Sequence, residues 1–261
     1  MSLLARKSVT RPASPRVFER LAEAYRHRPG YPDELTLRLL ALVAERPRVV
    51  DLGAGTGHLA LPLARAGARV VAVEPARAML EVCAERVRGL PVTLVQAPAE
   101  ATGLPAASAE LVVLADVAQW VDPDAAGREA RRLLVEEGVA ASVEARSAAT
   151  PFMRELEELL GEANPKRRPS RPGRARQWLA LATGRGRLQS SELLQSLPLA
   201  PEELEALLRS LSFLAPALGP ARMDALVGRA LALAERHGGA RWERVLLLSW
   251  GRSRAVRRAG R

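Results

Sequence analysis

The sequence predicts an α/β fold with a largely parallel sheet that is covered by helices on both faces. Short apolar segments of strand length alternate with helical segments from residue 48 to residue 143. This order is typical of parallel strands joined by crossover helices. The first apolar segment, Arg48 to Leu52, runs directly into a glycine-rich turn, Gly53 to Gly57. A buried strand followed by such a turn and a helix predicts a ligand site at the carboxyl edge of the sheet.

Seven segments have the length and apolar content of β-strands. They cover residues 48–52, 69–73, 92–96, 111–115, 139–143, 190–197 and 242–250. Apolar residues at helical spacing predict the helices. These cover residues 17–26, 34–44, 58–66, 76–87, 123–134, 153–160, 202–211 and 223–235, and a further short helix starts at Trp178. The Pro- and Arg-rich stretch Lys166 to Arg176 predicts a mobile loop.

The composition is that of a cytoplasmic protein with one sizeable core. The chain has 261 residues, of which 48% are hydrophobic and 3% aromatic, so the core must consist mainly of Leu, Val and Ala. No apolar run reaches the ~18 residues that a membrane span needs, and the N-terminus lacks the apolar region of a signal peptide. The single cysteine, Cys83, excludes an internal disulfide and a cysteine-based zinc cluster. We expect neither a metal nor a membrane partner.

The formal net charge is +10, which raises the question of a nucleic-acid partner. Nearly all of the positive charge is arginine, since Lys7 and Lys166 are the only lysines. Arginine together with abundant Ala, Leu, Gly and Pro is what a GC-rich coding sequence produces. This interpretation is favoured over nucleic-acid binding, although the sequence does not exclude the latter. The oligomeric state is not predicted.

The glycine turn itself indicates which ligand it holds. A dinucleotide fingerprint needs G-x-G-x-x-G, but the sixth position counted from Gly53 is His58. The glycines are spaced G-x-G-x-G instead, and the acidic Asp51 precedes them. A pyrophosphate would meet that carboxylate unfavourably, whereas a ligand with an ammonium and a sulfonium group would not. The sign of the charge therefore favours S-adenosylmethionine.

Glu74 supplies a second element of the predicted site. It follows the second strand, 17 positions after Gly57. A carboxylate at that place can accept hydrogen bonds from the two hydroxyls of a ribose.

These stretches resemble the motifs of class I S-adenosylmethionine-dependent methyltransferases. Val49 to Gly57 resembles their first motif, and Val73 to Leu80, an acidic residue followed by a Met-Leu pair, resembles the next. Ala97 to Glu100 and Asp116 to Asp122 resemble the segments that follow the third and fourth strands. Tyr25 to Pro32 is similar to the N-terminal signature of the small-molecule subgroup that includes trans-aconitate and ubiquinone-type methyltransferases.

The resemblance implies a Rossmann-like, seven-stranded, mostly parallel sheet with one antiparallel strand. It also implies a helical lid drawn from the N-terminus and the C-terminal half. We therefore expect an N-terminal helical cap over residues 1–45 and a cofactor-binding core over residues 46–145. Lid helices and final antiparallel strands over residues 146–261 complete the same domain.

The resemblance further implies a set of residues around S-adenosylmethionine. The expected cofactor-binding residues are Tyr25, Arg28, Asp51, Gly53, Ala54, Gly55, Thr56, Glu74, Pro75, Met79, Pro98, Ala99, Glu100, Asp116, Val117 and Gln119. Tyr31 and Trp120 are expected to line the acceptor pocket, and His27, Tyr31 and Asp116 are the candidates for a general base.

The expected activity is methyl transfer to a small organic molecule. Two alternatives stay open: an RNA or protein methyltransferase, and a protein that binds S-adenosylmethionine without catalysis. The acceptor molecule and its reacting atom are not predicted.

Overall fold

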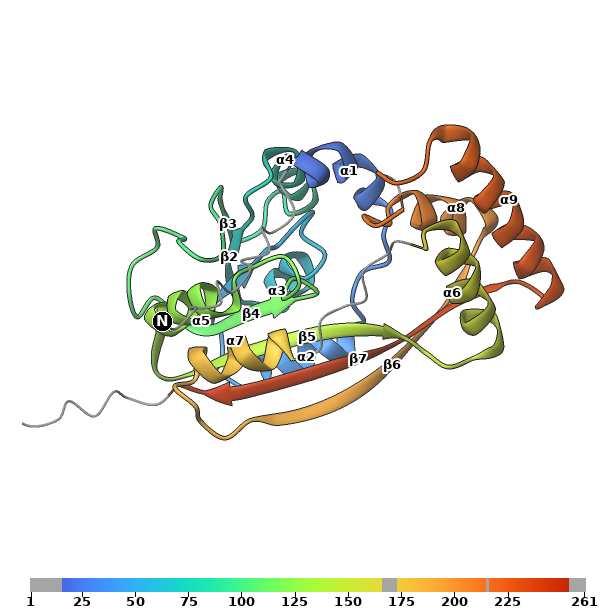
Figure 1. Ribbon diagram of the computed structural model, residues 1–261. Coiled ribbons are helices and arrows are strands. Elements are labelled where there is room, and N and C mark those ends of the chain that lie inside the picture. The colour runs from blue at the N-terminus through green and yellow to red at the C-terminus, as the bar shows by residue number, and fades with distance from the viewer. Residues whose placement is uncertain (1–15, 166–172, 215, 254–261) are drawn as a thin grey trace, which may run out of the picture.

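The computed structural model describes residues 16–165, 173–214 and 216–253, and their seven strands form one sheet in the order β3-β2-β1-β4-β5-β7-β6. The strands are β1 (Arg48–Leu52), β2 (Arg69–Val73), β3 (Val92–Val95), β4 (Ala109–Ala115), β5 (Leu134–Ser147), β6 (Gln189–Leu199) and β7 (Ala240–Arg252). The pairs from β3 to β5 are parallel, and β7 runs antiparallel to both β5 and β6. The predicted sheet with one antiparallel strand is thereby confirmed (Figure 1).

Helices cover both faces of the sheet and extend beyond one end of it. They are α1 (Arg16–Arg26), α2 (Asp33–Leu40), α3 (Ala60–Arg65), α4 (Arg77–Arg86), α5 (Pro123–Leu133), α6 (Pro151–Ala163), α7 (Arg174–Ala182), α8 (Pro201–Arg209) and α9 (Pro220–Arg236). Residues of α2, α3 and α4 share one buried cluster with the sheet, and residues of α5 and α7 share another. Alternate residues of β1 enter opposite clusters, Val49 the first and Val50 the second, as the period of a strand requires.

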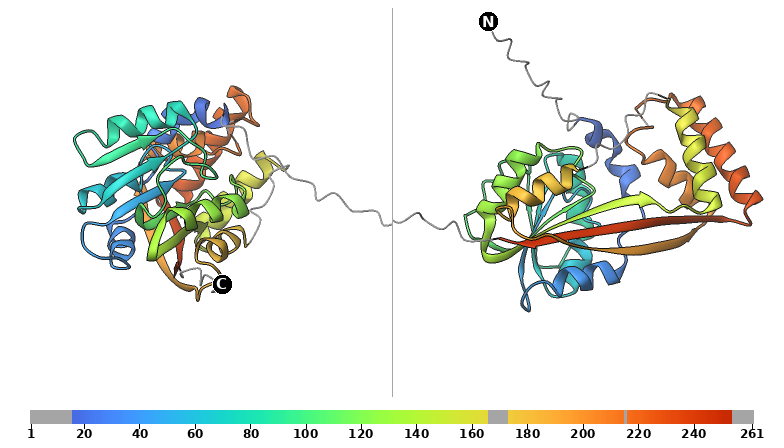
Figure 2. Two further views of the ribbon diagram at one scale, coloured as in Figure 1. Left: turned by 90° about the vertical axis from the view of Figure 1, so that its left-hand side faces the viewer. Right: turned by 60° about the horizontal axis from the view of Figure 1, so that its bottom comes forward.

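The helices α6, α8 and α9 form a separate group at the far end of the long strands β5, β7 and β6 (Figures 1 and 2). They enclose a buried cluster of their own, which includes Met153, Leu204 and Val227. Helix α1 lies between α4 and this group and contacts both α4 and α8. The parallel strands end at the edge that faces α1, so this edge carries helical cover from both ends of the chain. The division into cap, core and lid stays a proposal, and α2 and α7, which it assigns to the cap and the lid, pack on the faces of the sheet.

The predicted loop from Lys166 to Arg176 is wrong in its last residues. Arg174 to Arg176 belong to α7, which begins four residues before Trp178. The physical reason is tertiary, because the Arg174 guanidinium donates to backbone carbonyls of the segment after β4. Residues 166–172 lie outside the described part. Strand β5 is likewise longer than predicted, since it pairs with β7 as far as Ser147.

No helix in the described ranges is both long and apolar enough to cross a membrane.

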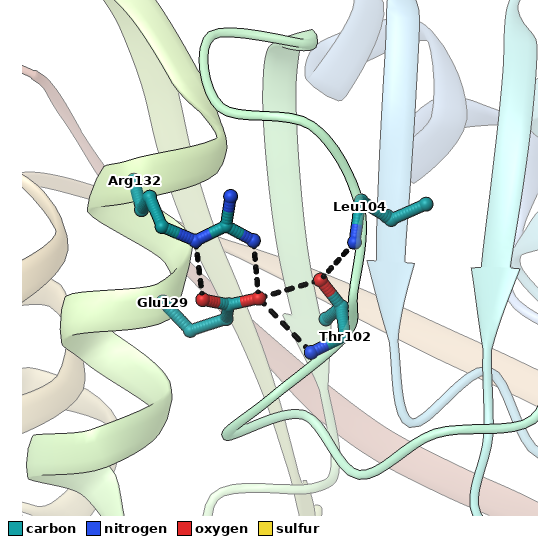
Figure 3. Close-up of polar contacts among 4 residues, drawn as sticks. All are labelled: Thr102, Leu104, Glu129 and Arg132. Atoms are coloured by element: carbon teal, nitrogen blue, oxygen red, sulfur yellow. Dashed lines mark hydrogen bonds and ion pairs between the residues drawn. The ribbon is translucent and has the colours of Figure 1, made fainter.

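The connection between β3 and β4 is fastened to α5 by one carboxylate (Figure 3). The Glu129 side chain, 9% exposed, accepts hydrogen bonds from the backbone N–H and the hydroxyl of Thr102 at 2.9 and 2.6 Å. Two nitrogens of Arg132 donate to the same carboxylate. The bonds from Arg132 and Thr102 lower the pKa of Glu129 to about 2. This carboxylate therefore holds the loop that carries Pro98 and Glu100 against the core.

We predict that Glu129→Gln lowers the free energy of unfolding by about 1–3 kcal/mol at pH 7, because charge-assisted bonds become neutral. The folded pKa lies below the ordinary value of 4.5, so this contribution is complete above that value and fades as the pH falls toward 2. Urea unfolding at pH 7 and pH 3 measures it, and the difference from wild type should shrink by at least half at pH 3. The control Glu158→Gln alters an exposed residue of α6 and should change neither value. An equal loss at both pH values would contradict the assignment.

Candidate functional site

The glycine turn after β1 brings backbone to the open edge of the sheet. The N–H groups of Gly53 and Ala54 both donate to the carbonyl of Val73 at the end of β2. Gly53 has φ 74°, and a Cβ there would lie 2.6 Å from Cγ2 of Val117. Gly55 also has positive φ, 54°, but a Cβ at Gly55 would meet no heavy atom of the protein within 4 Å. The turn is therefore closed on its Val117 side and open at Gly55.

Glu74 joins this turn to the start of α4. One carboxylate oxygen accepts the N–H of Gly55 at 3.0 Å, and the other accepts the N–H of Ala76 at 3.0 Å. The side chain is 7% exposed. Burial raises the pKa of Glu74, and the two backbone bonds oppose that rise. Both oxygens keep further lone pairs beside the open space at Gly55, where a ligand's hydroxyl groups can donate.

Asp51 lies beneath the same turn, and the loss of hydration of its buried carboxylate is poorly compensated by hydrogen bonds. Its side chain is 2% exposed, and Oδ2 has no hydrogen-bond partner among the described residues. Burial, followed by the charge of Glu74, raises the pKa of Asp51 to about 7. A buried carboxylate without a partner is costly, and a positively charged ligand group would relieve that cost. The site therefore suits a cation and opposes an anion.

Asp116 and Tyr31 form a latch between the core and the N-terminal segment. The Tyr31 hydroxyl donates to Oδ2 of Asp116 at 2.9 Å, and the N–H of Ala145 donates to Oδ1 at 2.7 Å. Burial and the Asp116 charge raise the pKa of Tyr31 well above its usual 10, so the phenol stays protonated. Asp116 also has φ 54°, a conformation that costs a non-glycine residue energy and often occurs at functional sites.

His58 and Arg28 connect the glycine turn, the N-terminal segment and the end of α8. The His58 ring lies between Thr56 Oγ1 and the carbonyl of Arg28, each at 2.9 Å, and burial lowers the pKa of His58 to about 3. Arg28 stacks over the Tyr25 ring at 4.2 Å and donates to Ser210 Oγ at 2.9 Å. His27 is exposed. The segment 25–31 thus connects the glycine turn to the end of α8.

Trp120 lies against α1. Its ring makes an edge-to-face contact with Phe18 at 5.1 Å between centroids, and Phe18 makes a second such contact with Tyr25 at 6.0 Å. Arg174 holds the Trp120 loop from the other side through the carbonyls of Ala118 and Val121. Three aromatic side chains therefore gather where α1 meets the loop that follows β4.

The expected adenine-side residues lie along the edge between β2 and β3. Met79 is 1% exposed and shares a buried cluster with residues of α1. The carbonyl of Pro75 accepts from Gln96 at 3.3 Å, and Glu100 accepts the N–H of Asp122 at 2.8 Å. Ala99 is buried and Pro98 is exposed. The structure thus brings these residues to the same edge as Glu74. Gln119 donates to the carbonyl of Asp116 at 2.9 Å and so belongs to the latch.

Sequence reasoning missed three residues that shape the site. Glu19 of α1 accepts the N–H groups of Arg77 and Ala78 at 2.8 and 2.9 Å and so caps α4 from another helix. Arg174 holds the Trp120 loop, and Glu144 lies beside Asp116, three residues before the end of β5. The partners of Glu19 and Arg174 are distant in the sequence, and the position of Glu144 depends on strand pairing, so no local pattern indicates these residues. Within the described residues, no group of three His, Cys, Asp or Glu side chains could hold a metal ion.

Known methyltransferases are similar to the part of the chain that forms this edge. Residues 50–142 match the family described as a methyltransferase domain. A curated uncharacterized methyltransferase of Mycobacterium tuberculosis is 39% identical over 138 residues, which cover 52% of this chain and 55% of that protein. A relative in Dictyostelium discoideum, also named as a methyltransferase, is 32% identical over 46% of each chain. The match to these curated relatives therefore spans about half of their length.

Solved structures show the same fold at lower sequence identity. A candidate type II methyltransferase of Anaeromyxobacter dehalogenans has a TM-score of 0.59 at 23% identity and covers 88% of this chain and 99% of its own. A phosphoethanolamine N-methyltransferase of Haemonchus contortus, with S-adenosylhomocysteine bound, has a TM-score of 0.53 at 17% identity and covers 94% of this chain and 61% of its own. Residues 50–142 therefore carry a methyltransferase domain, and the fold resembles that of solved class I S-adenosylmethionine-dependent methyltransferases.

Proposed function

We propose that this protein binds S-adenosylmethionine at the edge formed by the glycine turn and Glu74 and transfers its methyl group to a small organic acceptor. The observation that carries the proposal is the buried Asp51 carboxylate, whose Oδ2 lacks a partner in the described part of the chain. It lies below a backbone turn that is open at Gly55. A ligand with positively charged groups and a ribose meets both requirements at once.

Different residues at this edge would hold different parts of the cofactor. Asp51 offers negative charge to its ammonium group, and Glu74 offers lone pairs to its ribose hydroxyls. Pro75, Met79 and the segment Pro98 to Glu100 lie on the side expected for the adenine. When bound, the cofactor supplies a methyl group already activated by its sulfonium. The protein's part is then to align the acceptor and to exclude water.

The cover of the carboxyl edge supports a small acceptor. Helix α1 lies between α4 and the group α6, α8 and α9 (Figure 1), Trp120 contacts Phe18 of α1, and Arg28 connects the end of α1 to the end of α8 through Ser210. Such cover suits a molecule that is enclosed during transfer. The solved neighbour from Haemonchus contortus is named for its small amine substrate, which is consistent with this class.

A protein or RNA acceptor is the alternative, suggested by the net charge of +10. Several described arginines are engaged in ion pairs, such as Arg48 with Glu110 and Arg209 with Asp224, which leaves less charge for phosphates. A second alternative is activity other than methyl transfer, since one structural neighbour at a TM-score of 0.54 is named as a [4+2]-cyclase. Turnover with a small-molecule panel, insensitive to salt, supports the main proposal, whereas steep salt dependence favours nucleic acid.

We predict that S-adenosylhomocysteine binds more tightly than NAD and that Glu74→Ala weakens this binding at least tenfold. Loss of the carboxylate removes acceptors for two ligand hydroxyls and frees the N–H of Gly55, at a cost of roughly 1.5–3 kcal/mol. Isothermal calorimetry measures both affinities, and circular dichroism checks the fold. Glu81→Ala removes an exposed carboxylate from α4 and serves as the control. Tighter binding of NAD, or an unchanged affinity in a folded Glu74→Ala protein, would refute the assignment.

We predict that Gly55→Val abolishes binding of S-adenosylhomocysteine, because its side chain would enter the open space in front of the turn. Gly67→Val is the matched control, since Gly67 also has positive φ and no heavy atom within 4 Å of its Cβ position. Both substitutions place a β-branched residue at positive φ, 54° at position 55 and 96° at position 67, and circular dichroism checks that both proteins stay folded. Calorimetry should then show binding only in the Gly67 variant. Equal affinities would mean that the ligand does not approach Gly55.

We predict that Asp51→Asn weakens S-adenosylhomocysteine binding and flattens the dependence of stability on pH. The folded-state pKa of about 7 lies above the ordinary 3.8. The ligand-free wild type should therefore lose roughly 2–4 kcal/mol as the pH rises from 4 through 7. Thermal unfolding at pH 5 and pH 8 measures the loss, which should be smaller in the variant. An identical pH dependence in the two proteins would show that Asp51 is not buried as a costly charge.

A further inference from the structure

Glu144 occupies the position beside Asp116 at the carboxyl edge of the sheet. The N–H of Asp116 donates to the carbonyl of Val143, and the N–H of Ala145 donates to Oδ1 of Asp116. Glu144 therefore lies on β5 between the two residues, Val143 and Ala145, that form these bonds. Successive side chains of a strand point to opposite faces, so Glu144 lies on the same face as Ser142 and on the opposite face from Ala145.

Glu144 differs from Asp116 and Tyr31 because its carboxylate forms no hydrogen bond or ion pair within the described part of the chain. Both carboxylate oxygens of Asp116, its backbone N–H and its carbonyl all form hydrogen bonds, and one of these bonds comes from the Tyr31 hydroxyl. The backbone of the half-buried Glu144 is part of the β5–β7 ladder, whereas its side chain is without a partner among the described residues. Burial and the charge of Asp116 raise the pKa of Glu144, so the folded protein does not stabilise this carboxylate.

A second polar group on the same strand face lacks a partner. Ser142 is 1% exposed, and its hydroxyl oxygen has no hydrogen-bond partner within the described ranges. It lies two residues before Glu144 on β5. The backbone of Asp116, beside both, is held at φ 54°. Unpaired polar groups and local strain thus coincide at one point of the edge.

We propose that Glu144 is the residue that contacts the acceptor's reacting atom and that the acceptor presents an N–H or O–H group there. This inference rests on the proposed function. As the nitrogen or oxygen lone pair forms its bond to the methyl carbon, the carbon–sulfur bond breaks and its electron pair stays on sulfur. The proton released by the nucleophile goes to the Glu144 carboxylate. The protein therefore selects acceptors that carry a hydrogen on the nucleophile.

Glu192 provides a matched comparison within the same sheet. Glu144 and Glu192 both lie opposite Leu247, on either side of β7. The two carboxylates therefore share one row and one face, about two strand spacings or ~10 Å apart. Glu192 is exposed and pairs with Arg146 at 2.5 Å, whereas Glu144 is half-buried and unpaired. Replacing either residue by Gln removes one negative charge from the same row.

The test uses sinefungin, an analogue of S-adenosylmethionine with an amine in place of the sulfonium methyl group. Its ammonium stands where the methyl group and the acceptor meet, and S-adenosylhomocysteine lacks that group. We expect Glu144→Gln to weaken sinefungin at least tenfold in calorimetry while S-adenosylhomocysteine stays within twofold. Glu192→Gln should change neither affinity. Thermal unfolding verifies the fold, and Glu144→Asp, which keeps the charge, should retain part of the preference for sinefungin.

Other outcomes separate the failure of this inference from that of the proposed function. Equal effects of Glu144→Gln on the two ligands, or none on either, would overturn the role of Glu144 and leave cofactor binding intact. A similar loss of sinefungin affinity in Glu192→Gln would also overturn it, because the effect would then be one of general charge. Failure of both ligands to bind the wild-type protein would refute the proposed function and, with it, the inference.

Discussion

The carboxylate of Glu74 is the interaction on which the site depends. Its two oxygens accept the N–H groups of Gly55 and Ala76, so one side chain joins the turn after β1 to the start of α4. The carbonyl of Val73, one residue earlier, accepts from Gly53 and Ala54. The ends of two neighbouring parallel strands are thereby fixed to each other, and the backbone turn that is open at Gly55 is fastened to both.

The cover over this edge is held by polar contacts rather than by apolar packing alone. Tyr31 reaches Asp116, Arg28 reaches Ser210, and Arg174 reaches the carbonyls of the Trp120 loop. Each contact joins segments more than fifty residues apart in the sequence. Hydrogen bonds of this kind contribute modestly one by one, but together they fix the positions of the N-terminal segment, the loop after β4 and the end of α8.

Several buried carboxylates lie at this edge of the sheet, where burial makes their charged forms costly to the stability of the fold. Asp51 is buried with an unpartnered oxygen, and burial raises the pKa values of Asp51, Glu74 and Glu144. Elsewhere the protein pairs its buried carboxylates, as Glu129 with Thr102 and Arg132 shows. The contrast between the paired Glu129 in the scaffold and the unpartnered Asp51 Oδ2 and Glu144 side chain at the edge, within the described residues, is expected where a ligand is to supply the missing partner.

The sequence by itself determined the order of strands and helices, the glycine turn and the position of Glu74. Those features depend on local periodicity and on glycine's conformational freedom, both of which are visible within a few residues. Only the tertiary structure decided that the Tyr31 hydroxyl bonds Asp116, that Arg174 begins a helix, and that the Glu144 side chain finds no partner among the described residues. Which polar groups find partners depends on strand register and on contacts between distant segments, and the pattern of any single segment carries no record of them.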